Sequence, residues 1–254
     1  MSACMLNSRP MIIPPADLSY LRERLRELAD QVGDFWESTA RSETEIDSPA
    51  LLNEALNQLI GMLAQMQDEP ADTRIDPVEI STLGEYGLHL LDELSRLAAS
   101  LEQTALARDI EQLSLPFALW IARHGGEIRD LGPIVNALAR LANEAAHPQA
   151  MSDLYTHCCE LIEAASPACE ESSASDDQHP WRLLLLNRAI VATRSHNPEL
   201  MEPAFDAIVE CLPGDAQRFF AEGMEQVAVT NYPEPVRDVV RRYFLAHGEP
   251  RRLH

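Results

Sequence analysis

Residues Pro180–Arg194 form a largely apolar stretch, with the sequence PWRLLLLNRAIVATR, in a chain of 254 residues. Its apolar side chains cover every side of a helix drawn at about 100° per residue, so no continuous polar face remains. The apolar run is about half as long as the ~20 residues that a membrane span needs. We therefore expect other helices to surround this one in a large all-α fold that does not enter a membrane.

Composition agrees with a large core in a reducing compartment. The chain is 46% hydrophobic, and its five cysteines show no Cys-x-x-Cys spacing. An odd number of irregularly spaced cysteines does not suggest a disulfide framework and favours the cytoplasm. Residues 1–15 lack the apolar run of a secretory signal and are expected to form a flexible N-terminus.

The charge of the chain excludes several classes of function. The formal net charge is −21, which argues against binding to nucleic acid or to an anionic membrane. All 20 cationic residues are arginine. Without lysine there is no Gly-Lys-Ser phosphate loop and no Schiff-base lysine for a cofactor. We expect no cofactor.

Residues 16–103 are predicted to form a bundle of three long helices. The second helix begins at Pro49 after Ser48, and the third begins at Pro77 after Asp76; both pairs are typical of a capped helix start. The first helix carries a heptad-like seam. That seam packs inside an intramolecular bundle or forms the contact surface of a homo-oligomer, and it consists of Leu18, Leu21, Leu25, Leu28, Val32 and Phe35.

Residues 104–247 are predicted to form shorter helices with broader apolar faces. Gly125 and Gly126 provide a helix stop, and prolines mark the helix starts. Those starts lie near Pro133, Pro148, Pro180, Pro198, Pro213 and Pro233. The acidic stretch 166–179 is expected to be an exposed loop, and residues 248–254 a basic C-terminal tail. The fold expected is an α-solenoid-like stack after the bundle, with about ten helices in all.

An internal repeat underlies the second half. Residues 131–138 (LGPIVNAL) align with 201–208 (MEPAFDAI), and 234–240 (EPVRDVV) fit the same frame from its second position, with aligned positions 70 and 32 residues apart. Residues 234–244 resemble the second helix of HEAT-type repeats. The lengths of the helical pairs are similar to tetratricopeptide-like units, although the consensus spacings of that family do not line up. The resemblance implies stacked helical pairs and a scaffold or partner-binding role, and it assigns no functional residue.

Two groups of side chains have spacings that could bind metal. Glu144 and His147 have the Glu-x-x-His spacing of di-iron bundles, but a second copy is missing. Asp153, His157 and Glu160 share a helical face beside two cysteines, but a fourth zinc ligand is missing. We expect no metal. The alternative is a small-molecule- or metal-dependent all-helical enzyme built around His147 or His157.

Arginine supplies the candidate residues for partner binding. Arg188 interrupts the apolar central helix and needs a partner, which is an acid on a neighbouring helix or a carboxylate of a bound protein. The C-terminal arginines fold back on acidic helices of the chain or bind an acidic partner. They are Arg237, Arg241, Arg242, Arg251 and Arg252. Taken together, the sequence favours a non-catalytic, cytoplasmic helical-repeat protein that binds another protein.

Overall fold

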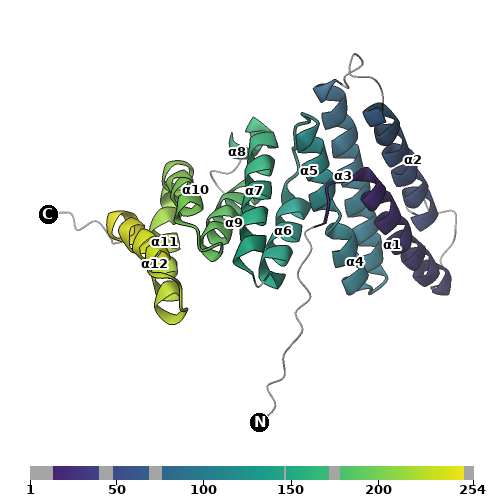
Figure 1. The fold of residues 1–254 in the computed structure, drawn as a ribbon. Coiled ribbons are helices and arrows are strands. Elements are labelled where there is room, and N and C mark those ends of the chain that lie inside the picture. Colours follow the sequence, from purple (N-terminus) through teal and green to yellow (C-terminus); the bar gives the residue numbers. More distant parts are fainter. Residues whose placement is uncertain (1–13, 40–47, 69–75, 146, 172–177, 249–254) are drawn as a thin grey trace, which may run out of the picture. The chain divides into compact units, whose positions relative to one another are not determined.

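The computed structural model describes residues 14–39, 48–68, 76–145, 147–171 and 178–248 (Figure 1). In these residues the regular structure consists of helices α1 to α12, a short π-helix and one isolated bridge. The predicted all-α fold class is confirmed. Arg251, Arg252 and most of the expected flexible segments, 1–15 and 248–254, lie outside the described residues.

The chain divides into two compact units. We call Pro15–Ala139 with His157–Leu184 the N-unit, and Arg140–Thr156 with Leu185–His254 the C-unit, to which Met1–Pro14 is also assigned. The boundary expected between residues 103 and 104 lies inside the N-unit. The observed division falls instead within α6, α7 and α9.

The N-unit is built on the three long helices predicted from its sequence, which lie side by side in Figure 1. Asp17 and Asp76 start two of them, since the side chain of Asp17 accepts the Ser19 N–H at 2.8 Å and that of Asp76 accepts the Val78 N–H at 3.0 Å. Two shorter helices complete this part. The bounds are α1 Leu18–Ser38, α2 Pro49–Asp68, α3 Pro77–Ser100, α4 Thr104–Glu111 and α5 Ser114–Arg123.

The apolar seam of α1 is buried within the N-unit, where α1 packs against α2, α3, α4 and α5. This packing places the seam inside an intramolecular bundle, and a homo-oligomer stays a prediction. One seam residue was predicted wrongly: Phe35 is 40% exposed, and Trp36 is buried in its place. The reason is that a straight helix drifts by ~20° per heptad from a 3.5-residue repeat.

Glycines allow α5 to approach α3 closely. A Cβ atom on Gly84 would lie 2.6 Å from Ile121 Cδ1, and one on Gly87 would lie 2.5 Å from Phe117 Cε1. Both distances are well inside van der Waals contact. These two positions therefore require glycine for the observed packing.

The segment after α5 departs from the sequence prediction. Gly125 has φ +80° and ends α5, as expected. The predicted loop 166–179 contains instead the short helix α8 (Pro167–Glu171), in which Cys169 is buried. The thiol of Cys169 donates to the Arg129 carbonyl at 3.2 Å, a long-range contact that the local acidic composition does not reveal.

Proline marks the helix starts of the second half, as predicted. In the C-unit, α10, α11 and α12 pack against one another around an aromatic cluster of Phe205, Phe219, Phe220 and Tyr243. The remaining bounds are α6 Gly132–Glu144, α7 Pro148–Ala164, α9 Pro180–Arg194, α10 Pro198–Cys211, α11 Pro213–Val229, α12 Glu234–Tyr243 and the π-helix Phe244–Gly248. None of the helices in the described ranges is both long enough and apolar enough to cross a membrane.

Candidate partner-binding groove

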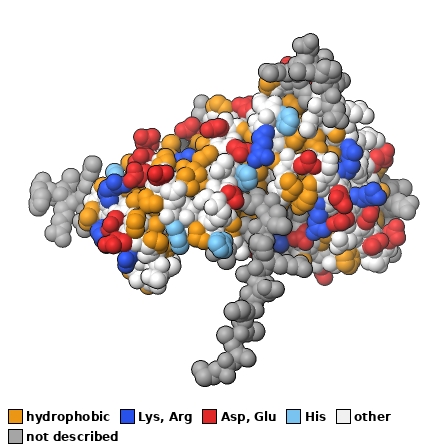
Figure 2. Space-filling view, viewed as in Figure 1, with side chains coloured by type: hydrophobic (Ala, Val, Ile, Leu, Met, Phe, Trp, Pro, Cys, Tyr) orange, Lys and Arg blue, Asp and Glu red, His pale blue; other side chains and the backbone are white. Residues whose placement is uncertain are grey.

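An open groove of about 300 Å³ lies in the C-unit between α9 and α11. Its floor is apolar and includes Phe205, Phe220 and Val240, which are almost fully buried. On the face shown in Figure 2, apolar side chains lie among acidic and basic ones over the part of the molecule where Figure 1 places α10, α11 and α12. We call this hollow the C-unit groove.

The walls of the C-unit groove follow helical spacing. On α9, positions 190, 193 and 194 share one face, and Ile190 on that face is 44% exposed. On α11, positions 219, 222, 223 and 226 share the facing side. The prediction that other helices cover every side of α9 is thus wrong at Ile190, because the groove opens beside it.

A glycine gives the groove part of its depth. Gly223 stands in the middle of α11, where a Cβ atom would meet only Val240 Cγ1 at 3.5 Å, an ordinary contact distance. Glycine in a helix interior costs roughly 0.5–1 kcal/mol relative to alanine. No steric contact in the described structure requires glycine here, so its presence keeps the groove open at a cost in helix stability.

Aromatic rings support the groove floor. The ring of Phe205 meets the rings of Phe220 and Tyr243 edge to face, with centroids 5.2 and 5.1 Å apart. The Tyr243 hydroxyl donates to Asp206 Oδ1 at 2.5 Å and so ties α12 to α10. Burial and this hydrogen bond to a carboxylate both raise the pKa of the Tyr243 phenol well above its usual range.

The candidate arginines Arg188 and Arg242 both contact the same turn of α10. Nη2 of Arg188 lies 3.5 Å from the Pro203 carbonyl oxygen, and Arg242 forms an ion pair with Glu202. Neither residue lines the groove. Their part in binding a partner stays a prediction, and the structure gives both a contact with α10.

The other described candidates lie along α12. Arg241 pairs with Asp238 on the same helix at 2.8 Å, and Arg237 is exposed. Both point away from the buried face of α12, which carries Val236, Val239 and Val240. The described C-terminal arginines, Arg237, Arg241 and Arg242, therefore do not line the groove.

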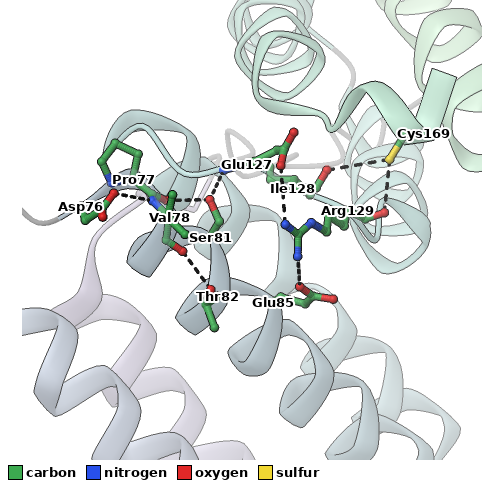
Figure 3. Close-up of polar contacts among 10 residues, drawn as sticks. All are labelled: Asp76, Pro77, Val78, Ser81, Thr82, Glu85, Glu127, Ile128, Arg129 and Cys169. Carbon is green, nitrogen blue, oxygen red and sulfur yellow. Dashed lines mark hydrogen bonds and ion pairs between the residues drawn. The ribbon is translucent and has the colours of Figure 1, made fainter. Parts of the chain in front are cut away.

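The N-unit contains a larger hollow of about 420 Å³ beside α3, with both apolar and charged side chains in its lining. Its charged groups pair with one another: Arg129 contacts Glu85 at 2.9 Å and Glu127 at 3.8 Å (Figure 3). Ser81 accepts the Glu127 N–H at 2.8 Å and fixes the segment that carries these residues. These contacts join α3 to the segment that follows α5.

The two metal-type spacings are not arranged as metal sites. Helix α6 ends at Glu144, which pairs with Arg140, so His147 lies beyond the helical turn that would align the two ligands. Glu160 is held by Arg123 at 2.7 and 3.2 Å; burial alone would raise its pKa, but the ion pair lowers it overall. Within the described ranges, no group of three or more His, Cys, Asp or Glu side chains could hold a metal ion.

The groove residues were missed at the sequence level because they come from four helices, α9 to α12, and the turn at Tyr232. One local signal was available, namely a glycine within the helical pattern of α11 next to the Phe219–Phe220 pair. Comparison with models of protein families, with curated proteins and with solved structures finds no match to this chain.

Proposed function

We propose that this chain is a non-catalytic, cytoplasmic binding protein that receives a segment of another protein in the C-unit groove. The observation that carries the proposal is an open groove with an aromatic floor and an exposed apolar wall at Ile190. Aromatic and aliphatic side chains in a pocket are typical of the energetic centre of a protein interface.

The size of the groove favours a side-chain anchor over a cofactor. Pockets that enclose drug-sized molecules span roughly 300–1,000 Å³, so the C-unit groove, at about 300 Å³ and open, lies at the lower end. A few large apolar side chains of a peptide suit that volume. This role agrees with the resemblance to helical-repeat families, whose members bind partners on helix faces.

Peptide selection tests the proposal directly. A peptide library displayed on phage is selected against the intact protein, and the enriched peptides are measured against Ile190→Glu and Val229→Glu. Val229 is 81% exposed on α11 and does not line the groove, so it is the matched control. We expect at least about tenfold weaker binding to Ile190→Glu, since a charge in an apolar site is penalised.

The control should bind as the wild type does, and so should a variant in which His147 and His157 are both alanine. Equal binding to Ile190→Glu and to wild type would contradict the proposal. A selection that enriches no peptide would do so as well. Binding lost only with the two histidines would favour the enzyme alternative.

A further inference from the structure

The polar groups on the α9 wall of the groove are already in use. The Thr193 hydroxyl donates to the Ala189 carbonyl at 2.9 Å. Arg194 donates through Nη1 to the Ala142 carbonyl at 2.6 Å and through Nη2 to that of Ala145 at 2.8 Å, at the C-terminal end of α6. Since backbone carbonyls occupy these donors, this wall offers a partner mainly its apolar surface.

The α11 wall differs from the α9 wall. Glu222 and Gln226 stand one turn apart, both are exposed, and neither side chain has a hydrogen bond or an ion pair with any described residue. An ionised carboxylate can only accept hydrogen bonds. Water supplies those donors while Glu222 is exposed, and a partner that covers Glu222 has to replace them. A cation is the donor that also balances the charge.

The backbone of both walls restricts the shape of the occupant. The walls are helices, whose backbone groups are already hydrogen-bonded, so they offer no strand edge to which a peptide could add. An apolar groove between two helices suits the apolar face of an amphipathic helix, which places anchors at positions i, i+3 or i+4 and i+7.

We infer that the C-unit groove receives an amphipathic helix of another protein, with large apolar residues one turn apart and an arginine or lysine beside Glu222. This inference rests on the proposed function. The carboxylate of Glu222 supplies the negative charge at the groove itself and favours a cationic segment. The net charge of −21 opposes a second copy of this acidic chain as the occupant.

Three fluorescent peptides test the occupant by polarisation. One is an amphipathic Leu/Lys helix, the second has glutamate in place of each lysine, and the third is proline-rich. Each is titrated with wild type, Gly223→Leu and Gly214→Leu. The first substitution fills the groove, whereas Gly214 lies in open space on the same helix and serves as the control.

We expect the Leu/Lys helix to bind wild type and Gly214→Leu equally and Gly223→Leu at least about tenfold more weakly. The other two peptides should bind more weakly than the Leu/Lys helix. Thermal melting shows whether each variant is folded. Equal binding to Gly223→Leu would mean general attraction to acidic surface and would overturn the inference, as would a preference for the proline-rich peptide.

Charge reversal tests the role of Glu222. Glu222→Arg should weaken binding of the Leu/Lys helix about fivefold at low salt and strengthen binding of the Leu/Glu helix. Glu225→Arg makes the same charge change outside the groove and should have less than half that effect on binding. Equal effects of the two substitutions would overturn the inference. If the selected peptides require Ile190 but ignore Glu222, the proposed function stands and this inference fails.

Discussion

Gly87 of α3 and Gly223 of α11 are both glycines inside helices, and their surroundings are opposite. At Gly87, Phe117 and Leu59 occupy the space that a Cβ atom would need, at 2.5 and 2.8 Å. At Gly223, Val240 is the only described residue outside α11 within 4 Å of an added Cβ atom, and the position lines an open groove. The same residue type allows a close helix contact in the N-unit and lines an open groove in the C-unit.

The two units also differ in charge. Each contains ten arginines, but the N-unit has 29 acidic residues and the C-unit, with residues 1–14, has 12, for net charges of −19 and −2. A strongly acidic surface keeps a protein soluble and repels other acidic chains. Most of the negative charge therefore belongs to the N-unit, and the proposed binding groove lies in the nearly neutral C-unit.

The largest expected effects come from truncating the two cores. Phe220→Ala should lower the free energy of unfolding by about 3–5 kcal/mol, and Leu94→Ala by about 2–5 kcal/mol, because each side chain is almost fully buried. Urea unfolding followed by circular dichroism measures both. If the units unfold separately, each variant shifts a different transition. A loss below about 1 kcal/mol for Phe220→Ala would contradict the aromatic cluster as the core of the C-unit.

The glycine pair gives the next largest effect, with opposite signs. Gly87→Ala should destabilise the protein by about 1–3 kcal/mol, because the added methyl group overpacks against Phe117. Gly223→Ala should stabilise it by roughly 0.5–1 kcal/mol, because alanine favours the helix and the space is open. The same urea titration compares them. Two changes of the same sign would remove the contrast between the units.

The smallest effect is a pH dependence at Tyr243. Its pKa is raised in the folded state by burial and by Asp206, so its contribution to stability is present below the unfolded value of about 10 and is lost as pH rises above it. No lysine titrates in this range, which simplifies the measurement. Unfolding between pH 8 and 11 should show wild type losing more stability than Tyr243→Phe. Equal losses would contradict the hydrogen bond.

Local signals predicted much of the fold. The proline starts of α2, α3, α7, α9, α10 and α11 and the stop at Gly125 follow from residues that act on their own backbone. The burial of Trp36 in place of Phe35 could be predicted only from the true period of the α-helix, which differs from the heptad repeat. Helix α8 depends on the contact of Cys169 with a segment 40 residues away, which acidic composition cannot indicate.

The candidate site was less predictable than the fold. Arg188 and the C-terminal arginines were chosen for charge, but the groove is defined by shape, through Ile190, Gly223 and aromatic rings from several helices. A periodic pattern identifies the apolar face of a helix. Which residues of that face stay exposed depends on how the helices pack. Arg194 was not singled out because its partners, the carbonyls of Ala142 and Ala145, belong to a distant helix.

Photo-crosslinking in cells that make the protein naturally shows whether the C-unit groove binds another protein. A photoreactive amino acid replaces Gln226 on the groove wall or, as the matched control, Gln58, which is exposed on α2 of the N-unit. We expect a discrete adduct with another protein from position 226, and we expect Gly223→Leu to abolish it. Position 58 should give no such adduct. Adducts of equal yield from both positions, or an adduct at 226 that persists when the groove is filled, would contradict binding in the groove.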